Sequence, residues 1–159
     1  MAAQKKRKAA PGDIASNRQA AFKYHFLEKL EAGLVLTGSE VKSARDGKVQ
    51  LKDGYASVDV NEVWLHNVHI APYAPASREN HEPERPRKLL LHAAEIERLR
   101  SRVRERGLTI VPTRMYFSGG RAKVEIALAK GKDAGDKREA IKERESKRDM
   151  DRALREAGR

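Results

Sequence analysis

The chain has 159 residues, of which 39% are hydrophobic and 36% are charged, and its formal net charge at pH 7 is +11. This length suits one domain with extensions, and the positive charge favours a polyanionic partner, nucleic acid before an anionic membrane. No apolar run approaches the ~18 residues of a membrane-spanning helix, and no signal-peptide core follows the first residues. The absence of cysteine excludes disulfides and thiolate metal sites. We therefore expect a cytoplasmic protein that does not contact a membrane.

Residues 1–13 hold the basic run Lys5–Lys8, followed by a proline and a glycine, and show no apolar pattern. Such a segment has nothing to bury, so we predict a mobile basic arm over residues 1–13. The arm either serves solubility alone or adds diffuse contacts to phosphates. The folded body is then expected to span residues 14–130, where the apolar residues concentrate.

From Phe22 to Leu36 every even-numbered position is apolar except Glu28. This period of two predicts one long strand, and a strand of this length must bend, as strands do when a sheet closes into a barrel. Several of the same apolar residues also recur four positions apart, so a helix that ends near Gly33 is the alternative. The pattern favours the strand without excluding the helix.

Thr37 and Glu40 have the spacing of a capping box, and Gly47 is suited to end a helix, so we predict a short helix over residues 38–45. Residues rich in β-formers then predict strands near 49–51, over 55–60 and over 63–70, separated by turns. Adjacent apolar residues on the last strand point to opposite faces. That arrangement favours a small antiparallel barrel with helices outside over an open two-layer sheet.

Four prolines bracket a polar loop over residues 72–88 that shows no core signal. A loop this long in a compact domain is either functional or disordered. After it, Ile96, Leu99 and Val103 repeat at i, i+3 and i+7 and predict an amphipathic helix over residues 93–106. Its outer face collects Arg98, Arg102, Arg104 and Arg106, either as a solvated face or as a contact for RNA.

Residues 108–130 predict a β-hairpin. The first half is rich in β-formers and ends in the turn signal Ser118–Arg121. In the second half, Val124, Ile126 and Leu128 alternate with polar or small residues, which buries one face and wets the other. The apolar pattern stops at Lys130, where a charged tail begins.

The segment from residue 130 to the end has eleven Lys and Arg and eight Asp and Glu. Asp136 and Glu139 have the spacing of a capping box, and the residues after them predict a helix to about Ala157. Like charges at i, i+4 disfavour an isolated helix by roughly 0.2–0.5 kcal/mol per pair. We therefore predict that the tail, residues 131–159, is disordered alone and helical along a phosphate backbone, with a merely solubilising tail as the alternative. One face of the helix would carry Lys137, Arg144, Arg148, Arg152 and Arg155.

The sequence offers little for catalysis. His66 and His69 are three apart in a predicted strand, so their side chains face opposite sides and cannot share a metal. The turn Ser118–Arg121 is not followed by the Gly-Lys-Ser/Thr of a phosphate-binding loop. We therefore expect no enzyme, no cofactor and no metal site. A small barrel with basic extensions favours nucleic-acid binding, because barrels of the oligonucleotide-binding type hold nucleic acid on one sheet face and its loops.

Five blocks of the sequence resemble the SsrA-binding proteins, the small protein B family of bacterial trans-translation. The blocks occur in the family order and extend over nearly the whole chain, about residues 13–159. The resemblance implies an oligonucleotide-binding barrel with helices outside it, and it favours the strand for residues 22–36. The blocks are Glu31–Ser43, Arg87–His92, Ala129–Lys132, Asp136–Arg138 and Ile141–Glu145.

The resemblance also implies a function. Members of this family bind the tRNA-like domain of transfer-messenger RNA and carry it, alanylated and with elongation factor Tu, to the empty A site of a stalled ribosome. The body takes the place of the missing anticodon arm. The tail becomes helical in the vacant mRNA channel, beside the decoding centre of the small subunit. We expect this chain to be a monomeric adaptor of the same kind, with catalysis left to the ribosome.

Carried over by motif, Asn17, Tyr24, Glu31, Tyr55, Leu91 and Lys123 are expected to contact the RNA. A lysine can meet phosphate, whereas an asparagine or a glutamate can bond base edges or ribose hydroxyls. Because phosphate repels a carboxylate, Glu31 makes sense only as an acceptor from base or ribose donors. For Tyr24 and Tyr55, a place in the core is the alternative. The expected ribosome contacts of the tail are Gly131, Lys132, Asp136, Lys137, Arg138, Lys142, Arg144, Arg148, Arg152 and Arg155.

Two rival functions are open from the sequence. A general ribosomal-RNA-binding or ribosome-assembly protein would use the same barrel and bind structured RNAs indiscriminately. A nuclease or nucleotide enzyme would need a cluster of carboxylates to hold metal, and the sequence shows no such cluster.

Overall fold

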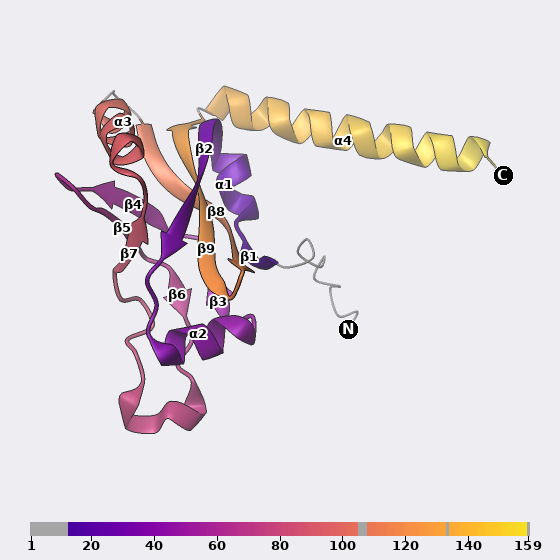
Figure 1. Ribbon diagram of the computed structural model, residues 1–159. Helices are drawn as coiled ribbons and strands as arrows, with labels where there is room; N and C mark the ends of the chain where they lie inside the picture. The colour runs from indigo at the N-terminus through magenta and orange to yellow at the C-terminus, as the bar shows by residue number, and fades with distance from the viewer. Residues whose placement is uncertain (1–12, 105–107, 133, 159) are drawn as a thin grey trace.

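The structure is a computed structural model that describes residues 13–104, 108–132 and 134–158. Strands dominate the body and helices lie around them (Figure 1). The elements in chain order are β1 (Asp13–Ser16), α1 (Arg18–Lys23), β2 (Tyr24–Leu34), α2 (Gly38–Arg45), β3 (Val49–Gln50), β4 (Tyr55–Val58), β5 (Val63–His66), β6 (His69–Ile70), the 3-10 helix η1 (Ala74–Glu79), β7 (Arg87–Leu90), α3 (Ala93–Val103), β8 (Leu108–Ser118), β9 (Arg121–Gly131) and α4 (Ala134–Ala157).

Six antiparallel strands of the described residues close into a barrel. Their order is β8–β4–β5–β7–β2–β9, and β9 pairs back onto β8. The strand β1 pairs with the second half of β8, while β3 and β6 form a separate two-stranded sheet. The predicted fold class is confirmed: the chain is mainly β, an antiparallel barrel of the oligonucleotide-binding type with flanking helices and a basic tail helix.

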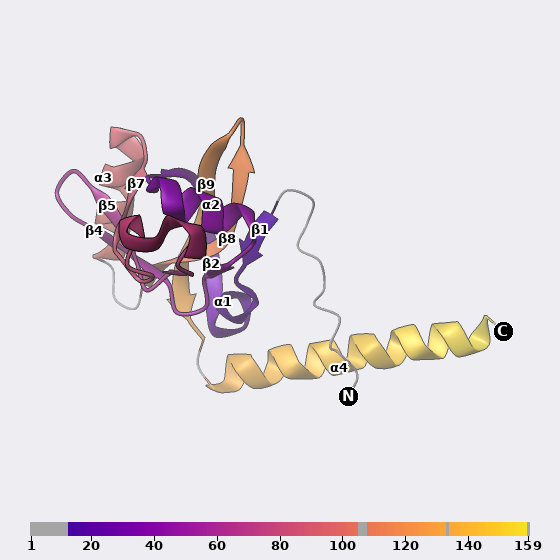
Figure 2. The ribbon, with the colours of Figure 1, turned by 90° about the horizontal axis from the view of Figure 1, so that it is seen from below.

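The core of the barrel is filled by the inward faces of its strands and closed by two helices. Leu65, Ile110 and Leu128 are fully buried inside. Helix α3 covers one end of the barrel and α2 lies across the other (Figures 1 and 2). The predicted stripe of α3 faces this core, and full burial of Leu99 contributes roughly 1.5–3 kcal/mol.

The strand predicted from Phe22 begins only at Tyr24, because residues 18–23 form α1. The predicted bend of this strand is a β-bulge. Phe26 lies opposite Ala129 and Glu28 lies opposite Leu128, so Leu27 has no partner of its own. The bulge switches the faces of the strand. Phe26 packs outside the barrel against α1 with Ala129, whereas Leu30 packs inside.

The predicted hairpin and the predicted helix over residues 38–45 are both confirmed. Strands β8 and β9 pair along their length and turn through Gly119 and Gly120, whose φ angles are +58° and +75°. These positive values suit the tight turn of a hairpin and favour glycine. Helix α2 ends where Gly47, at φ +74°, donates its N–H to the carbonyl of Ala44.

The strand predicted over residues 63–70 is instead two strands. The strand is interrupted at Asn67, which adopts a left-handed conformation with φ +58°. Asparagine tolerates this conformation better than most residues. Strand β5 therefore stays in the barrel, and β6 leaves it to pair with β3. As a result, His66 and His69 belong to different sheets.

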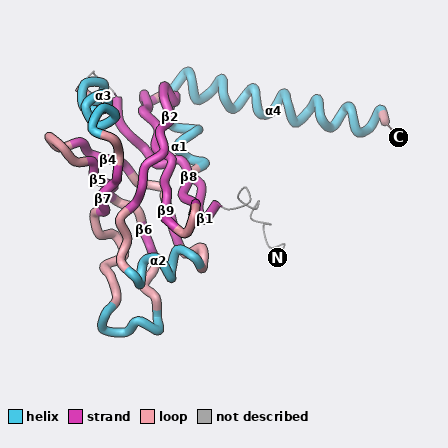
Figure 3. The backbone as a smooth tube through the Cα atoms, in the orientation of Figure 1, coloured by secondary structure: helices cyan, strands magenta, loops and turns pink. Residues whose placement is uncertain are grey.

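Helix α4 leaves one end of the barrel and extends away from the body as one continuous helix (Figures 1 and 3). Its 24 residues correspond to about 36 Å. It begins at Ala134, so Asp136 lies inside the first turn and not at the predicted N-cap. Disorder of the free tail stays a prediction. Of the predicted arm, residues 1–12 lie outside the described residues, and Asp13 belongs to β1.

Across the described residues, no helix combines the length and the apolar character that a membrane crossing requires.

Candidate nucleic-acid interface

A ladder of alternating charges crosses the outer face of β2, β9 and β8. Arg114 donates to Glu125 and to Asp13, each at 2.9 Å. Lys29 lies 3.6 Å from Glu125, and the Lys123 Nζ lies 3.9 Å from a Glu31 oxygen. Cross-strand pairing places these side chains on one face, because Glu31 is opposite Glu125 and Arg114 is opposite the same residue. We call this the ladder: Asp13, Lys29, Glu31, Arg114, Tyr116, Lys123 and Glu125.

Hydrogen bonds also hold two of the three acids of the ladder, Glu125 and Glu31. Burial opposes ionisation of Glu125, but hydrogen bonds from Arg114 and Thr113 outweigh it and hold the pKa of this carboxyl below its ordinary value. The Tyr116 hydroxyl donates to Glu31. Burial of the phenol, followed by the bond to Glu31, raises the pKa of Tyr116 to about 12. The phenol is therefore protonated at neutral pH and acts as a donor.

Three of the expected RNA contacts line a hollow beside the ladder. Glu31, Leu91 and Lys123 come from β2, the segment before α3, and β9. The hollow has a volume of about 540 Å³. Its walls are both apolar and polar, which suits an amphipathic ligand such as a base or a ribose. The remaining lining residues include Leu36, Val41, Leu90, His92, Glu95, Phe117 and Arg121.

The other three expected contacts line a second hollow, of about 270 Å³, between α1, β4 and β8. Tyr24 is half-buried there, outside the barrel core, because it lies before the bulge on the α1 side. Tyr55 is exposed and stacks on His66, with ring centroids 5.1 Å apart. Two lysines, Lys23 and Lys52, also line this hollow. Aromatic rings with adjacent cations are a common platform for single-stranded bases.

Asn17 lines the second hollow, but its side chain is only 7% exposed and is bonded internally. Its Nδ2 donates to the carbonyls of Leu51 and Pro112, at 3.2 and 2.9 Å. Its Oδ1 accepts from the Ala20 N–H as the N-cap of α1. In the structure Asn17 therefore ties α1 to the barrel, and its direct contact with RNA stays a prediction.

The hinge to the tail is tied to the body. Gly131 pairs with Tyr24, and the backbone N–H of Lys132 donates to the carbonyl of Lys23 at 2.9 Å. The Lys132 Nζ also donates to the carbonyl of Ala21, so this residue caps the end of α1. Beyond the hinge, Asp136 and Lys137 lie in the first turns of α4. Of the expected ribosome contacts, the structure exposes the basic side chains of Arg138, Lys142, Arg144, Arg148, Arg152 and Arg155.

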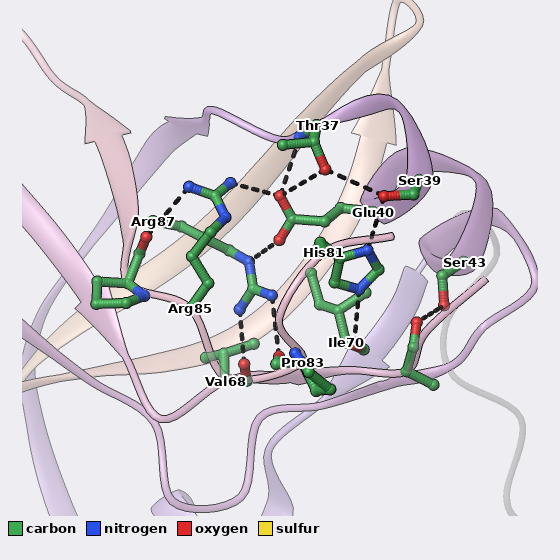
Figure 4. A network of polar contacts seen from close by, with 12 residues as sticks. Thr37, Ser39, Glu40, Ser43, Val68, Ile70, His81, Pro83, Arg85 and Arg87 are labelled. Atoms are coloured by element: carbon green, nitrogen blue, oxygen red, sulfur yellow. Dashed lines mark hydrogen bonds and ion pairs between the residues drawn. The ribbon is translucent and has the colours of Figure 1, made fainter. Parts of the chain in front are cut away.

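Sequence reasoning missed a buried polar network under the 72–88 loop (Figure 4). Arg87, treated as part of a loop without a core signal, is fully buried and donates to Glu40. Arg85 donates to the same carboxylate, and His81 joins Ser39 to the carbonyl of Ile70. Burial disfavours the charged form of Glu40, but the bonds from both arginines and from Thr37 hold its pKa below the ordinary value. The network clamps the loop onto α2.

Two further residues of the interface, Arg114 and Tyr116, carried no signal through the family motifs. The alternating pattern of the hairpin does contain a signal for them, because residues 114 and 116 share a face with Lys123 and Glu125. Among the described residues, no group of three or more potential ligands is arranged to hold a metal ion.

Comparisons with known proteins agree with this geometry. The SmpB protein family model matches residues 14–156. An SsrA-binding protein of Thermobifida fusca (strain YX) is 58% identical over 91% of this chain and 91% of its own length. Another, from Trichodesmium erythraeum (strain IMS101), is 57% identical over 90% of this chain and 92% of its own.

A solved structure agrees as well. It is described as "tmRNA-SmpB: a journey to the center of the bacterial ribosome" and matches with a TM-score of 0.66 and 46% identity. The match covers 80% of this chain and 93% of that one. With a family match that takes in barrel and tail, and relatives of more than half identity over nine-tenths of its length, the chain belongs to the SmpB protein family of SsrA-binding proteins.

Proposed function

We propose that this chain is an RNA-binding adaptor for trans-translation. It binds the tRNA-like domain of transfer-messenger RNA and delivers that RNA, alanylated and with elongation factor Tu, to the A site of a stalled ribosome. The observation that carries the proposal is the family match over residues 14–156, which includes both the barrel and nearly all of the tail helix. The adaptor acts in the cytoplasm as a monomer, and the ribosome performs the catalysis.

The barrel, from β1 to residue 130, is the part that we assign to the tRNA-like domain. Its two hollows and the ladder between β2, β9 and β8 supply hydrogen-bonding groups, aromatic rings and lysines on the surface of the barrel. Structured RNA is recognised largely through ribose hydroxyls, phosphates and unstacked bases, which need this mixture of groups. The proposed contacts are Tyr24, Glu31, Tyr55, Leu91 and Lys123, with Asn17 holding α1 in place.

The tail, from residue 131, is the part that we assign to the small subunit. Helix α4 extends away from the barrel as a single helix (Figure 1). Its described basic side chains, from Arg138 onward, are exposed. Such a helix suits a narrow channel lined by phosphates, because each Lys or Arg replaces counterions there. An mRNA downstream of the decoding centre would occupy the same channel, so the tail tests whether the channel is empty.

Binding to an isolated tRNA-like domain and to an ordinary tRNA, both across a salt series, tests the proposal. We expect a preference for the tRNA-like domain that persists at high salt, since hydrogen bonds and shape depend little on counterion release. Equal and salt-labile binding to both RNAs would contradict it, with each phosphate contact adding roughly 0.7–0.9 to the slope.

The alternative, a general ribosomal-RNA-binding or assembly protein, is separated by one substitution. Glu31→Arg adds a cation at the first hollow. A binder that relies on phosphate contacts gains affinity from the change, whereas the adaptor loses the acceptor that meets base or ribose donors. Lys29→Glu, on the same strand and face, serves as the control for charge, because it adds an acid of opposite effect on phosphate without altering Glu31.

A further inference from the structure

Glu31 poses a chemical problem in an RNA-binding surface. Its carboxylate is half exposed at the first hollow and carries a full negative charge, which neighbouring phosphates repel. A glutamate side chain with free rotamers would also turn away from the RNA, and ordering it on binding would cost affinity. A useful acceptor at this place must be held still and have its charge shared.

Tyr116 meets both requirements. It lies on β8, two strands from Glu31, and its ring reaches across β9 so that the hydroxyl donates to Glu31 Oε2. The other oxygen, Oε1, lies 3.9 Å from Lys123, the residue that pairs with Tyr116 across the strands. Glu31 and Lys123 line the hollow, whereas Tyr116 approaches the carboxylate from the side of the ladder.

The phenol itself is held in place. The guanidinium of Arg114 lies over the Tyr116 ring, 4.5 Å from its centre. Arg114 is in turn fixed by Glu125 and Asp13, at 2.9 Å each. The orientation of the ring therefore rests on strands β1, β8 and β9 together, and a rigid support of this kind is what a binding group needs to act without reorganisation.

We propose that Tyr116 is a positioning residue for RNA recognition, which fixes the Glu31 carboxylate and shares its charge so that the remaining lone pairs accept from base or ribose donors of the tRNA-like domain. The inference rests on the proposed function and adds the residue on which its specificity depends. It also separates two roles on one face: Lys123 serves the phosphate, and the Tyr116–Glu31 pair serves the readout.

A double-mutant cycle in the full-length protein tests the proposal. Tyr116→Phe removes one oxygen and keeps the ring under Arg114. We expect it to weaken binding to the tRNA-like domain about five- to tenfold, and binding to an ordinary tRNA by less than about twofold. In the Glu31→Ala background the same change should have no effect beyond about twofold, because the side-chain oxygen that accepts from Tyr116 is already gone. Tyr73→Phe, which alters a phenol beside Lys42 and outside the hollow, is the matched control.

Additive losses in the cycle would overturn the proposal, as would an equal loss for both RNAs in Tyr116→Phe. If Tyr116 had only a structural role, Tyr116→Phe would weaken RNA binding equally in both backgrounds. The two proposals also fail differently. If Glu31→Ala lowers the preference for the tRNA-like domain and Tyr116→Phe does not, only the positioning role falls. If the unaltered protein shows no preference, the adaptor function falls and takes this inference with it.

Discussion

Glu40 and Arg87 are 47 residues apart in the sequence and meet as an ion pair in which both side chains are fully buried. The remaining donors of Arg87 reach the carbonyls of Val68 and Pro83, at 2.6 and 3.0 Å. A buried pair of charges is tolerated only when its other polar atoms are bonded in this way. The network thereby fixes a segment that separates two strands of the barrel.

Breaking this pair should be costly. Glu40→Gln leaves the Arg87 guanidinium buried without a counter-charge, so we expect the free energy of unfolding to fall by about 3–5 kcal/mol. Urea unfolding at pH 7 measures the change. Glu62→Gln removes an exposed acid that pairs with Lys88 and should alter stability little. A similar loss in both variants would show that the buried network has no special weight.

The same carboxylate predicts the acid sensitivity of the fold. Because the pKa of Glu40 lies below its ordinary value of 4.5, the unfolded chain binds more protons than the folded one between these two values. The stability that Glu40 contributes is therefore complete above about pH 5.5 and is lost as pH falls through the folded pKa. Unfolding midpoints from pH 7 down to 3.5 should fall more steeply for the unaltered protein than for Glu40→Gln. Parallel curves would assign the acid response to other groups, of which Glu125 is the first candidate.

Asn17 should act on RNA binding through the fold. Asn17→Ala removes one hydrogen bond from each of the Leu51 and Pro112 carbonyls and removes the cap of α1, at a cost of about 2 kcal/mol in stability. Asn17→Ser keeps a cap acceptor and should recover part of that stability. We expect RNA affinity to follow stability through the pair of variants. Recovery of stability in Asn17→Ser without recovery of affinity would establish a direct contact instead.

The tail should be separable from the body. Ending the chain after residue 133 removes α4 and keeps the bonds that Gly131 and Lys132 make to the body. We expect the affinity for the tRNA-like domain to change by less than about threefold, since the hollows do not include α4. Alanine transfer on ribosomes stalled at the end of an mRNA should be abolished. As a control, Gln in place of Arg148, Arg152 and Arg155 keeps the length and removes charge, and an intermediate loss is expected. Equal loss of binding and of transfer would refute the division of labour.

Helix α4 should be ordered near the body and loose beyond it. Arg144 lies over the Phe22 ring at 5.6 Å, and the described side chains after it are exposed. Repulsion between Arg144, Arg148 and Arg152 also weakens an isolated helix. Amide exchange in the free protein should therefore be slow only before about residue 145, and Phe22→Ala should make it fast throughout. Strong protection up to Ala157 in the free protein would rule out folding that is coupled to binding.

The elements that the sequence predicts correctly are those with local causes. The capping box at Thr37 and Glu40 defines α2, a stripe of three apolar residues defines α3, and two glycines define the turn of the β8–β9 hairpin. In each case the residues that decide the structure lie within one or two turns of one another. The barrel follows from the number and length of the strands, and the family motifs support it.

The features that the sequence leaves open depend on partners far along the chain. The bulge at Leu27 exists because of how β9 pairs with β2, and the period of two is the same with or without it. Helix α1 is short, and its Phe22 fits the strand pattern as well as the helix. Arg87 lies in a proline-rich segment, and nothing near it in the sequence indicates that it is buried. Its burial depends on the negative charge of Glu40, which is far along the chain. The interface shows the same limit, since the motifs indicate Glu31 and Lys123 but not the tyrosine two strands away.

The ladder balances three basic residues, Lys29, Arg114 and Lys123, with three acidic ones, although the whole chain has a net charge of +11. The excess charge that attracts RNA over a distance therefore lies elsewhere, and much of it belongs to the two ends of the sequence. Residues 1–12 have four Lys and Arg and no Asp or Glu, and residues 130–159 have eleven Lys and Arg against eight Asp and Glu. Long-range attraction governs how fast partners meet, whereas short contacts govern how long they stay together. In this protein the rate of association should respond to ionic strength through the basic segments at both ends of the sequence, and the lifetime of the complex should be set by a surface that salt scarcely affects.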